Sequence, residues 1–376
     1  MMICILIIIL LIIPFLVDFF INGKAFFKRL KIGRWSNRKE WIKKVNEVCN
    51  RWIKNSPTVK KTDNSRLIIL DILKGNYKNS TIQSWQIGSL YLGLIECKSE
   101  NYNYLFIDKY GNWLNKPIEV DFALLGYAIL RNTKDKNLIK PAMDEVYDLI
   151  LSRKVEEDNG IAYRCGIKNI RFVDTVGFVA PFLALYGQCY GNQDAIDLSL
   201  SVIKEYYKNG FNKDCKLPVH AYDISSLVPL GIYGWGRGAG WYLLGIMDNY
   251  LVTKDEELKS IIIDLADKYL EYQKDDGSFG SILQLKNGSD SSITAICAYY
   301  YACCEKLFNK DKYRETSEKC INYLMSVTRR NGEIDFSQGD TKGIGLYSTT
   351  YDIMPFTQGI ALRAISILNK LGDLNE

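Results

Sequence analysis

The sequence predicts an all-α protein, an (α/α)6 toroid in which six helical hairpins form a closed double ring. Two observations indicate this fold. After residue 36, helical spacings of apolar residues follow one another almost without a break. The helices also alternate in character, because charged, amphipathic ones are followed by ones that are apolar on all sides and rich in Gly and Ala. The apolar helices recur roughly every 55 residues, a repeat typical of closed helical arrays.

The two sets of helices can be placed in chain order. The amphipathic helices of the outer ring are expected over residues 37–55, 102–114, 136–153, 192–207, 256–273 and 311–327. The apolar helices of the inner ring are expected over residues 80–96, 120–132, 174–188, 237–251, 289–304 and 357–371. A short apolar piece at 67–73 and a long irregular stretch ending at Gly234 fall outside this pattern. Small residues on the inner helices should allow them to approach closely.

The N-terminus differs in kind from the rest of the chain. Ile3–Ile21 is almost wholly apolar, broken only by Pro14 and Asp18, and these 19 residues can just span a bilayer. No small-residue cleavage site follows them, so an uncleaved anchor is expected rather than a signal peptide. The sequence thus predicts three parts: a transmembrane anchor over 1–22, a basic juxtamembrane linker over 23–36, and the six-hairpin domain over 37–376.

The basic character of the chain is concentrated next to this anchor. The first 40 residues contain seven Lys and Arg residues against two acidic ones, so their net charge equals the +5 of the whole chain. The positive-inside rule then predicts a single-pass membrane protein whose six-hairpin domain lies in the cytoplasm. The rest of the chain is neutral overall, which argues against nucleic acid as a partner.

Cysteine and histidine usage argues against a zinc site. The ten Cys residues include no C-x-x-C pair, and the chain has one His. Cysteines spread in this way are typical of free thiols in a reducing compartment. The many aromatic residues, 25 Tyr and 7 Trp among them, suit both a large core and a carbohydrate site.

Two carboxylates stand at the expected starts of inner helices. Asp121 opens one in Glu-Val-Asp-Phe-Ala, and Asp174 opens the next, directly ahead of a long apolar run. Each could simply be an N-cap, a position that Asp favours. The architecture, however, brings the loops before all inner helices to one end, where they should form a cup. Two carboxylates facing each other in a cleft are suited to acid–base chemistry.

Further candidates lie in the same set of loops. Arg164 follows Tyr163 in the loop before the Asp174 helix. His220 stands in His-Ala-Tyr-Asp, ahead of a helix that opens with Trp-Gly-Arg-Gly-Ala-Gly-Trp, residues 235–241. Taken singly, His220 is more often structural than chemical, Arg237 could brace a loop, and Trp241 could belong to the core. Their convergence on one cup favours a functional role for all of them.

Three strings carry a resemblance to a known family. Val-Asp-Thr-x5-Pro-Phe-Leu-Ala (173–184), His-Ala-Tyr-Asp (220–223) and Trp-Gly-Arg-Gly-Ala-Gly-Trp (235–241) resemble the unsaturated glucuronyl and rhamnogalacturonyl hydrolases, glycoside hydrolase families 88 and 105. The resemblance covers roughly residues 40–370 and implies the same (α/α)6 fold. It further implies hydrolysis of unsaturated uronyl oligosaccharides by protonation and hydration of the C4=C5 double bond, without a metal or cofactor. The hydrated sugar then opens and its linkage breaks.

The resemblance also implies residue roles. Asp174 matches the general acid and base of the family, and Asp121 matches a second carboxylate that fixes the substrate or keeps the first one protonated. The expected substrate-binding residues are Arg164 and Arg237 for the sugar carboxylate, Trp241 for ring stacking and His220 for a hydroxyl group. Two strings depart from the family pattern: Ala239 replaces a usual Asn, and Asp-Ser-Ser at 290–292 replaces a usual Glu-Thr-Ser.

An alternative function stays open at this point. Related six-hairpin proteins also serve exopolysaccharide biosynthesis, so the chain could be a membrane-anchored assembly factor that trims or merely binds glycan. A toroid-fold epimerase is a third alternative, although such sites commonly use several His residues and this chain has one. The presence of both Asp121 and Asp174 favours an enzyme that acts on an oligosaccharide or polysaccharide.

Overall fold

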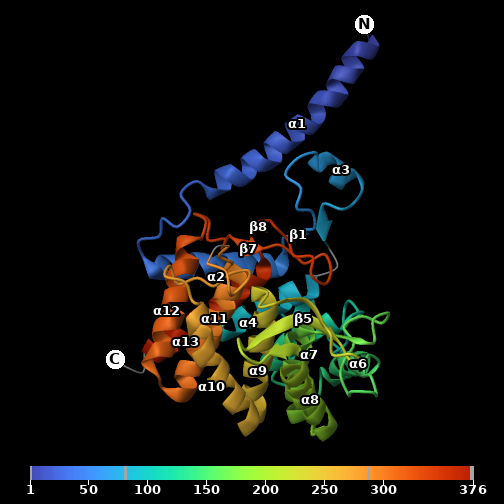
Figure 1. Ribbon diagram of the computed structural model, residues 1–376, viewed down its shortest axis with the longest axis vertical. Helices are drawn as coiled ribbons and strands as arrows, with labels where there is room; N and C mark the ends of the chain where they lie inside the picture. Colours follow the sequence, from blue (N-terminus) through green and yellow to red (C-terminus); the bar gives the residue numbers. More distant parts are fainter. Residues whose placement is uncertain (1, 80–82, 287, 373–376) are drawn as a thin grey trace.

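Six inner helices form a closed ring in the computed structural model, which describes residues 2–79, 83–286 and 288–372, with backbone alone for 2–10 and 371–372. They are α4 (Gln83–Glu96), α5 (Ala123–Asn132), α7 (Val173–Tyr190), α9 (Gly236–Thr253), α11 (Ser291–Phe308) and α13 (Pro355–Gly372). Each packs on the next one in this order, and α13 packs back on α4. The predicted ring of apolar helices is therefore confirmed (Figure 1).

Five amphipathic helices surround this ring. They are α2 (Arg38–Lys54), α6 (Lys140–Leu151), α8 (Gln193–Gly210), α10 (Glu256–Tyr269) and α12 (Asp311–Ser326). Helix α2 is typical, because it buries Trp41, Val45 and Trp52 on one face and leaves its charged residues on the other. Its N-cap, Asn37, accepts hydrogen bonds from the backbone N–H groups of the first turn.

The prediction of a sixth outer helix over residues 102–114 was wrong. A single 3-10 turn, η1 (Asn103–Leu105), is followed by a tight loop closed by a β-bridge between Ile107 and Trp113. The carboxylate of Asp108 accepts hydrogen bonds from the N–H groups of Tyr110 and Asn112, which favours a turn over a helix. Gly111 has a φ of +86°, a conformation that a helix cannot contain.

Glycines allow the inner helices to touch backbone to backbone. A Cβ atom added at Gly359 of α13 would lie 2.1 Å from the carbonyl oxygen of Ser89 in α4. A Cβ atom at Gly177 of α7 would lie 2.7 Å from the carbonyl oxygen of Trp241 in α9. No larger residue fits at either site unless the helices separate. The small residues in the inner set therefore have the packing role that their pattern predicted.

A buried ion pair crosses the ring. Arg363 of α13 donates two hydrogen bonds to the carboxylate of Asp248 in α9, at 2.8 and 2.9 Å. The hydroxyl of Tyr299 in α11 donates to the same carboxylate. All three side chains are buried, so the pair ties three inner helices together in the interior.

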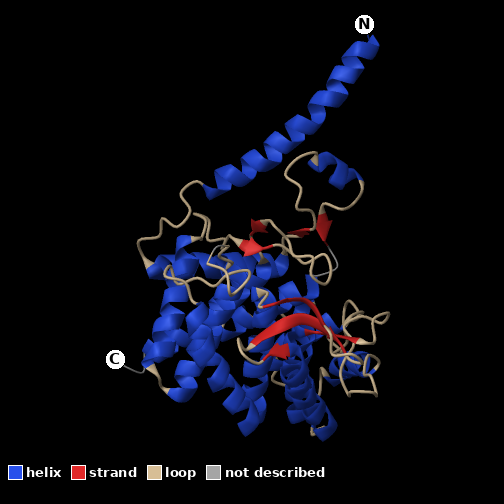
Figure 2. Ribbon diagram, viewed as in Figure 1, coloured by secondary structure: helices blue, strands red, loops and turns tan. Residues whose placement is uncertain are grey.

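Short strands occupy the loops between helices (Figure 2). The stretch expected to be irregular before Gly234 contributes three strands, β4, β5 and β6, to a four-stranded antiparallel sheet. In this sheet β5 lies between β3 and β4 and also pairs with β6. The strands of this sheet are β3 (Ile170–Phe172), β4 (Phe211–Asn212), β5 (Leu217–Asp223) and β6 (Pro229–Tyr233). Two hairpins are β1–β2 (Val59–Lys60, Lys78–Asn79) and β7–β8 (Ser337–Gln338, Tyr351–Asp352), and short 3-10 turns are η2 (Val120–Phe122) and η3 (Leu270–Tyr272). Phe172 pairs with Ala221, so the start of α7 lies beside His220 of β5.

The N-terminal helix α1 (Met2–Arg29) extends away from the helical body, and the short helix α3 (Ile68–Leu73) lies next to it (Figure 1). The carboxylate of Asp18 accepts hydrogen bonds from the N–H groups of Leu67 and Ile68 and so holds the start of α3 against α1. Helix α1 continues to Arg29, so the segment predicted as a linker over 23–36 is helical in its first half.

The transmembrane assignment for residues 1–22 is not supported by the structure. The side chains of residues 1–10, which make up nearly half of that segment, lie outside the described residues. Across the described part of the chain, no helix combines the length and the apolar character that crossing a bilayer requires.

Candidate active site

A pocket of about 290 Å³ lies among the loops that precede the inner helices. Five of the six site residues expected from the sequence line it: Arg164, Asp174, His220, Arg237 and Trp241. The sixth, Asp121, is not among the lining residues but contacts one of them, Arg164. The cup predicted from the repeat pattern therefore exists, and it brings these residues together.

Asp174 lies in the first turn of α7 but does not cap the helix. The N-cap is Phe172, which makes no side-chain hydrogen bond to the helix, so the plain N-cap interpretation of Asp174 is wrong. The Oδ2 atom of Asp174 is buried and has no hydrogen-bond partner among the described residues. Burial raises the pKa of Asp174 to about 7, against the opposing effect of the Arg237 guanidinium. Near neutral pH this carboxyl group is partly protonated.

Asp121 lies in η2, with 3% of its surface exposed. Its Oδ2 atom lies 3.5 Å from Nη2 of Arg164, whose Nη1 atom lies 3.4 Å from Oε2 of Glu119. Burial raises the pKa of Asp121 to about 6, although Arg164 opposes this shift. From the sequence, Asp121 was expected to raise the pKa of Asp174. The carboxyl group with the largest effect on Asp174 is instead Asp340.

His220 lies on β5 with its ring between aromatic side chains. Its ring centroid lies 4.6 Å from that of Trp235 and 5.9 Å from that of Phe172. Burial lowers the pKa of His220 to about 4, and the positive charge of Arg237 contributes to the same shift. The imidazole is therefore neutral at physiological pH, with one nitrogen that donates and one that accepts.

Arg237 is a buried cation in the first turn of α9, with 1% of its surface exposed. Its guanidinium donates to the carbonyl oxygens of Gln338 at 2.5 Å and Gly339 at 2.7 Å. Asp290, the N-cap of α11, holds this loop in place by accepting a hydrogen bond from the N–H of Gln338 at 3.0 Å. Within the described residues Arg237 makes no ion pair with a carboxylate, so its charge is available to an anionic ligand.

Trp241 forms the floor of the pocket rather than an open stacking surface. Its rings pack against Phe178 at 4.3 Å, Phe356 at 4.7 Å and Trp85 at 5.4 Å, and 1% of its surface is exposed. Other aromatic side chains complete the lining: Tyr163, Phe172 and Trp235. The pocket is thus lined by both polar and aromatic side chains, as sugar-binding sites often are.

One carboxylate of the pocket, Asp340, was not predicted from the sequence. Asp340 lies in the loop between β7 and β8, and it accepts a hydrogen bond from the Nδ2 of Asn79 at 3.0 Å. Burial raises the pKa of Asp340, while Arg237 opposes the shift. A signal was present, because Ser-Gln-Gly-Asp-Thr-Lys-Gly at 337–343 belongs to the long loop before the last inner helix. Nothing in that string separates Asp340 from an ordinary turn residue.

The chemistry of the pocket follows from these groups. It combines a carboxyl group that can give or take a proton near neutral pH, a guanidinium with no carboxylate partner among the described residues, and a neutral imidazole. Among the residues that the structure describes, no three His, Cys, Asp or Glu side chains cluster as metal ligands would. The expectation that no metal or cofactor takes part stays a prediction.

The fold resembles those of several solved structures. A possible GH105 family member from Klebsiella pneumoniae superposes with a TM-score of 0.73 at 16% identity, covering 90% of this chain and 95% of the other. An unsaturated glucuronyl hydrolase specific for heparin gives 0.64 at 16% identity, covering 89% and 98%. The unsaturated glucuronyl hydrolase of Bacillus sp. GL1, responsible for glycosaminoglycan degradation, gives 0.63 at 14% identity, covering 88% and 94%. At these identities the likeness establishes the fold.

Family membership rests on the sequence itself. The comparison with curated proteins gave no match. The family model described as Glycosyl Hydrolase Family 88 matches residues 44–370, which is most of the chain and includes all of the inner ring except the last two residues of α13. The chain therefore belongs to glycosyl hydrolase family 88.

Proposed function

We propose that this protein hydrolyses unsaturated uronyl oligosaccharides by hydrating the C4=C5 double bond of the terminal sugar. One observation carries the proposal: Asp174, whose carboxyl group is partly protonated near neutral pH, and Arg237, a buried cation with no carboxylate partner among the described residues, line the same pocket. An unsaturated uronate presents a carboxylate on C5, next to the carbon that must receive a proton. The pocket offers a cation for the first group and an acid for the second.

The reaction follows from the chemistry of this double bond, which is an enol ether. The protonated Asp174 donates its proton to C4, and the positive charge that develops at C5 is shared with the ring oxygen. A water molecule then adds its oxygen to C5, and the Asp174 carboxylate takes up the proton that this water releases. The product of hydration is a hemiketal at C5, whose bond to the ring oxygen breaks to leave a ketone at C5 and a hydroxyl group on C1. The bond from C1 to the leaving sugar then breaks, the leaving sugar takes the hydroxyl proton, and C1 becomes an aldehyde. Asp174 ends the cycle protonated, as it began.

Other residues bind and orient the substrate in this proposal. Arg237 binds the C5 carboxylate, and the bound carboxylate removes part of the positive field that lowers the pKa of Asp174. Substrate binding therefore favours the protonated form that the first step requires. Asp121 acts through Arg164, which it holds at the pocket edge. His220 offers a neutral imidazole to a sugar hydroxyl, and Trp241 supports the ring from the floor.

The relatives support an acidic oligosaccharide as the substrate. One neighbour is specific for heparin and another degrades glycosaminoglycans. A decisive experiment follows the ultraviolet absorbance of purified unsaturated uronyl disaccharides, which is lost when C4=C5 is hydrated. We expect the wild-type protein to abolish this absorbance with at least one disaccharide. If it leaves every such disaccharide unchanged, the protein is instead a glycan-binding assembly factor.

We further propose that α1 attaches the protein to a membrane, with the catalytic domain in the cytoplasm. Its described apolar side chains support attachment, because Phe15, Phe19 and Phe20 are each about 70% exposed. Basic residues follow directly after them, and the described cysteines are all free. Cys165 is exposed, so an impermeant thiol reagent can report its side of the membrane. Labelling of Cys165 in intact cells would place the domain outside and contradict this assignment.

A further inference from the structure

A second cavity, of about 360 Å³, lies between α1 and the loops of the cup. It is separated from the active-site pocket by a thin wall. Lys78 and Gly339 line the cavity, while the residues that directly follow them, Asn79 and Asp340, line the pocket. The hydrogen bond from Asn79 to Asp340, 3.0 Å long, joins the two segments of this wall. The two spaces are therefore immediate neighbours.

The cavity is strongly basic. Five cationic side chains line it, against the single carboxylate of Asp352, and they are Lys24, Lys28, Lys60, Lys78 and Arg329. Asp352 already pairs with Arg329 at 2.8 Å and with Lys60 at 3.1 Å. The other three lysines form no ion pair with any residue that the structure describes. Three uncompensated charges around one cavity of this volume are suited to a small anionic ligand.

The α1 side of the cavity is fixed to the body. Arg29 donates two hydrogen bonds of 2.8 Å to the carboxylate of Asp335 and a third of 2.6 Å to the carbonyl oxygen of Tyr351. Its guanidinium also lies 4.7 Å from the ring centroid of Phe336. Lys24 and Lys28 lie within the two turns before Arg29, so they are held near the cup. The family model begins at residue 44, so Lys24, Lys28 and Arg29 lie outside the part of the chain that it matches.

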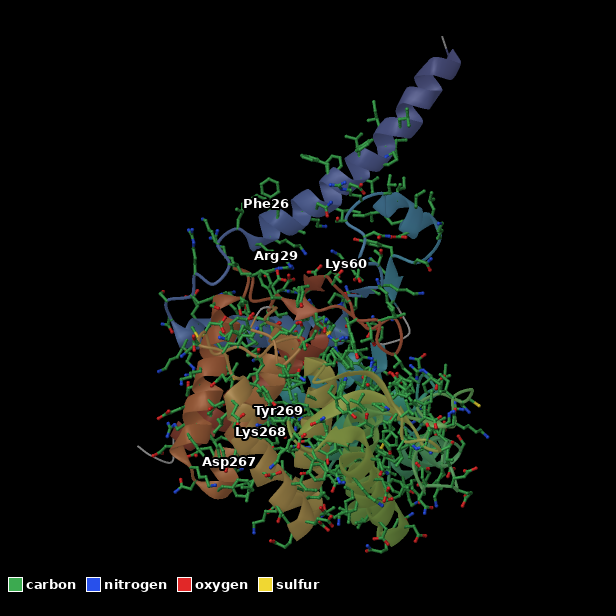
Figure 3. All side chains as sticks on the ribbon, viewed as in Figure 1. Phe26, Arg29, Lys60, Asp267, Lys268 and Tyr269 are labelled. Atoms are coloured by element: carbon green, nitrogen blue, oxygen red, sulfur yellow. The ribbon has the colours of Figure 1, made fainter. Side chains whose placement is uncertain are left out.

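The two sides of α1 differ in character, and this decides which ligand the lysines suit. Phe26 and Phe27 are about two-thirds exposed, and Figure 3 shows Phe26 on the side of α1 turned away from the body. Arg29 and Lys60 lie between α1 and the body in the same view. A lipid surface would meet the aromatic side, whereas Lys24 and Lys28 line the cavity on the other side.

We propose that this cavity is an accessory saccharide site that binds a uronate, sulfate or phosphate group on the leaving portion of the substrate. This inference rests on the proposed function, because it concerns the same substrate. It adds that the portion beyond the unsaturated sugar is acidic. Lys24, Lys28 and Lys78 hold the anionic group, and the Asn79–Asp340 wall separates it from the reacting unit. The site selects acidic oligosaccharides over neutral ones with the same terminal sugar.

The kinetic test compares two substrates with the same unsaturated sugar, using full-length protein in detergent. One is a disaccharide with an uncharged leaving sugar, and the other is a tetrasaccharide with sulfates on its leaving portion. We expect Lys24→Gln with Lys28→Gln to lower the ratio of kcat/KM, tetrasaccharide over disaccharide, about fivefold. Lys31→Gln with Lys39→Gln removes the same charge outside the cavity and should leave the ratio unchanged. An unchanged ratio in the first variant, or an equal loss in the control, would overturn the proposal.

A binding measurement keeps this result separate from the proposed function. Titration calorimetry with a saturated, sulfated tetrasaccharide, which has no double bond to hydrate, should show about fivefold weaker binding to the first variant than to the control. That loss supports the cavity even if the wild-type protein hydrolyses no unsaturated disaccharide. Flotation with vesicles containing phosphatidylglycerol tests the lipid alternative. If the first variant loses vesicle binding but keeps its affinity for the tetrasaccharide, the lysines bind lipid headgroups and the proposal is wrong.

Discussion

The Nε2 atom of His220 lies 3.7 Å from the Oδ2 atom of Asp174, too far for a direct hydrogen bond. The pKa of His220 is lowered to about 4, so the contact is not an ion pair at neutral pH. Neither Asp174 Oδ2 nor His220 Nδ1 has a hydrogen-bond partner among the described residues, although both are buried. A buried polar atom without a partner needs an explanation, and a catalytic or ligand-binding role is one. These two atoms lie where a sugar hydroxyl and the reacting carbon are expected to bind.

Asp174→Asn should abolish most of the activity, because the amide can neither donate a proton to C4 nor take one from water. We expect kcat to fall by at least ~10² to 10⁴, the usual share of general acid–base catalysis. Asp194 occupies the same position in α8 that Asp174 occupies in α7, the second residue of the helix. Asp194→Asn is therefore a matched control and should keep wild-type activity. Equal activity of Asp174→Asn and wild type would show that another group supplies the proton.

The same Asp174→Asn variant should be more stable than wild type at alkaline pH. The folded pKa of about 7 lies above the ordinary value of 3.8, so the native state binds the proton more tightly than the unfolded state. The free energy of unfolding of the wild type should therefore fall as pH rises from about 4 to 7. The asparagine of the variant does not titrate, so the variant should not lose this stability. We expect a gain on the order of 2 kcal/mol at pH 8 and almost none at pH 4, measured by urea unfolding. A variant less stable than wild type at pH 8 would contradict the raised pKa.

Asp340, rather than Asp121, should control the pH dependence of catalysis. Asp174 must be protonated to act, so kcat/KM should decline above pH of about 7. Asp340→Asn removes a negative charge that raises the pKa of Asp174, so the decline should begin at lower pH. Asp121→Asn should reduce activity but should shift this alkaline limb of the kcat/KM profile by a smaller amount. If Asp121→Asn moves the limb further than Asp340→Asn, the role assigned to Asp340 is wrong.

The ring of inner helices could be predicted because its cause is local. A helix that is apolar on all sides is stable only when it is buried in the protein interior. Residues such as Gly177 and Gly359 lie where two of these helices come closest to each other. The missing outer helix at 102–114 could not be predicted in this way. Its apolar spacing resembles that of a helix, but the turn fixed by Asp108 and Gly111 overrides the pattern. Hydrogen bonds between side chains and the backbone decide here between a turn and a helix. Such bonds do not change the spacing of apolar residues, from which helices are predicted.

The site could be predicted where its residues begin an inner helix, as Asp174 and Arg237 do. Asp340 could not be predicted, because its place depends on pairing between distant segments. The β7–β8 hairpin, the hydrogen bond from Asn79 and the bond from Gln338 to Asp290 together bring this loop into the cup. Those partners lie up to 261 residues away in sequence. The same holds for the basic cavity, whose α1 wall depends on Arg29 and Asp335.

Arg237 and Arg363 are equally buried, each with 1% of its surface exposed, but they differ in their partners. Arg363 is paired with Asp248 through two hydrogen bonds. Arg363→Met leaves the Asp248 carboxylate buried without its partner, and such a change usually costs about 3–5 kcal/mol of stability. Arg237 bonds only to backbone carbonyls and to the sulfur of Met354 among the described residues, so Arg237→Met strands no carboxylate. We expect the free energy of unfolding to fall much less at Arg237.

Arg237→Met, the variant expected to lose less stability, should lose more activity than Arg363→Met. Loss of Arg237 removes the cation for the substrate carboxylate, so KM should rise by about tenfold or more, because hydrogen bonds to charged groups are worth about 1.5–3 kcal/mol each. It also removes a charge that lowers the pKa of Asp174, so the alkaline limb of kcat/KM should move to higher pH. Arg363→Met, assayed below its unfolding temperature, should keep the wild-type KM and the wild-type limb. A normal KM for Arg237→Met would show that the sugar carboxylate binds elsewhere, with Arg164 the remaining arginine in the pocket.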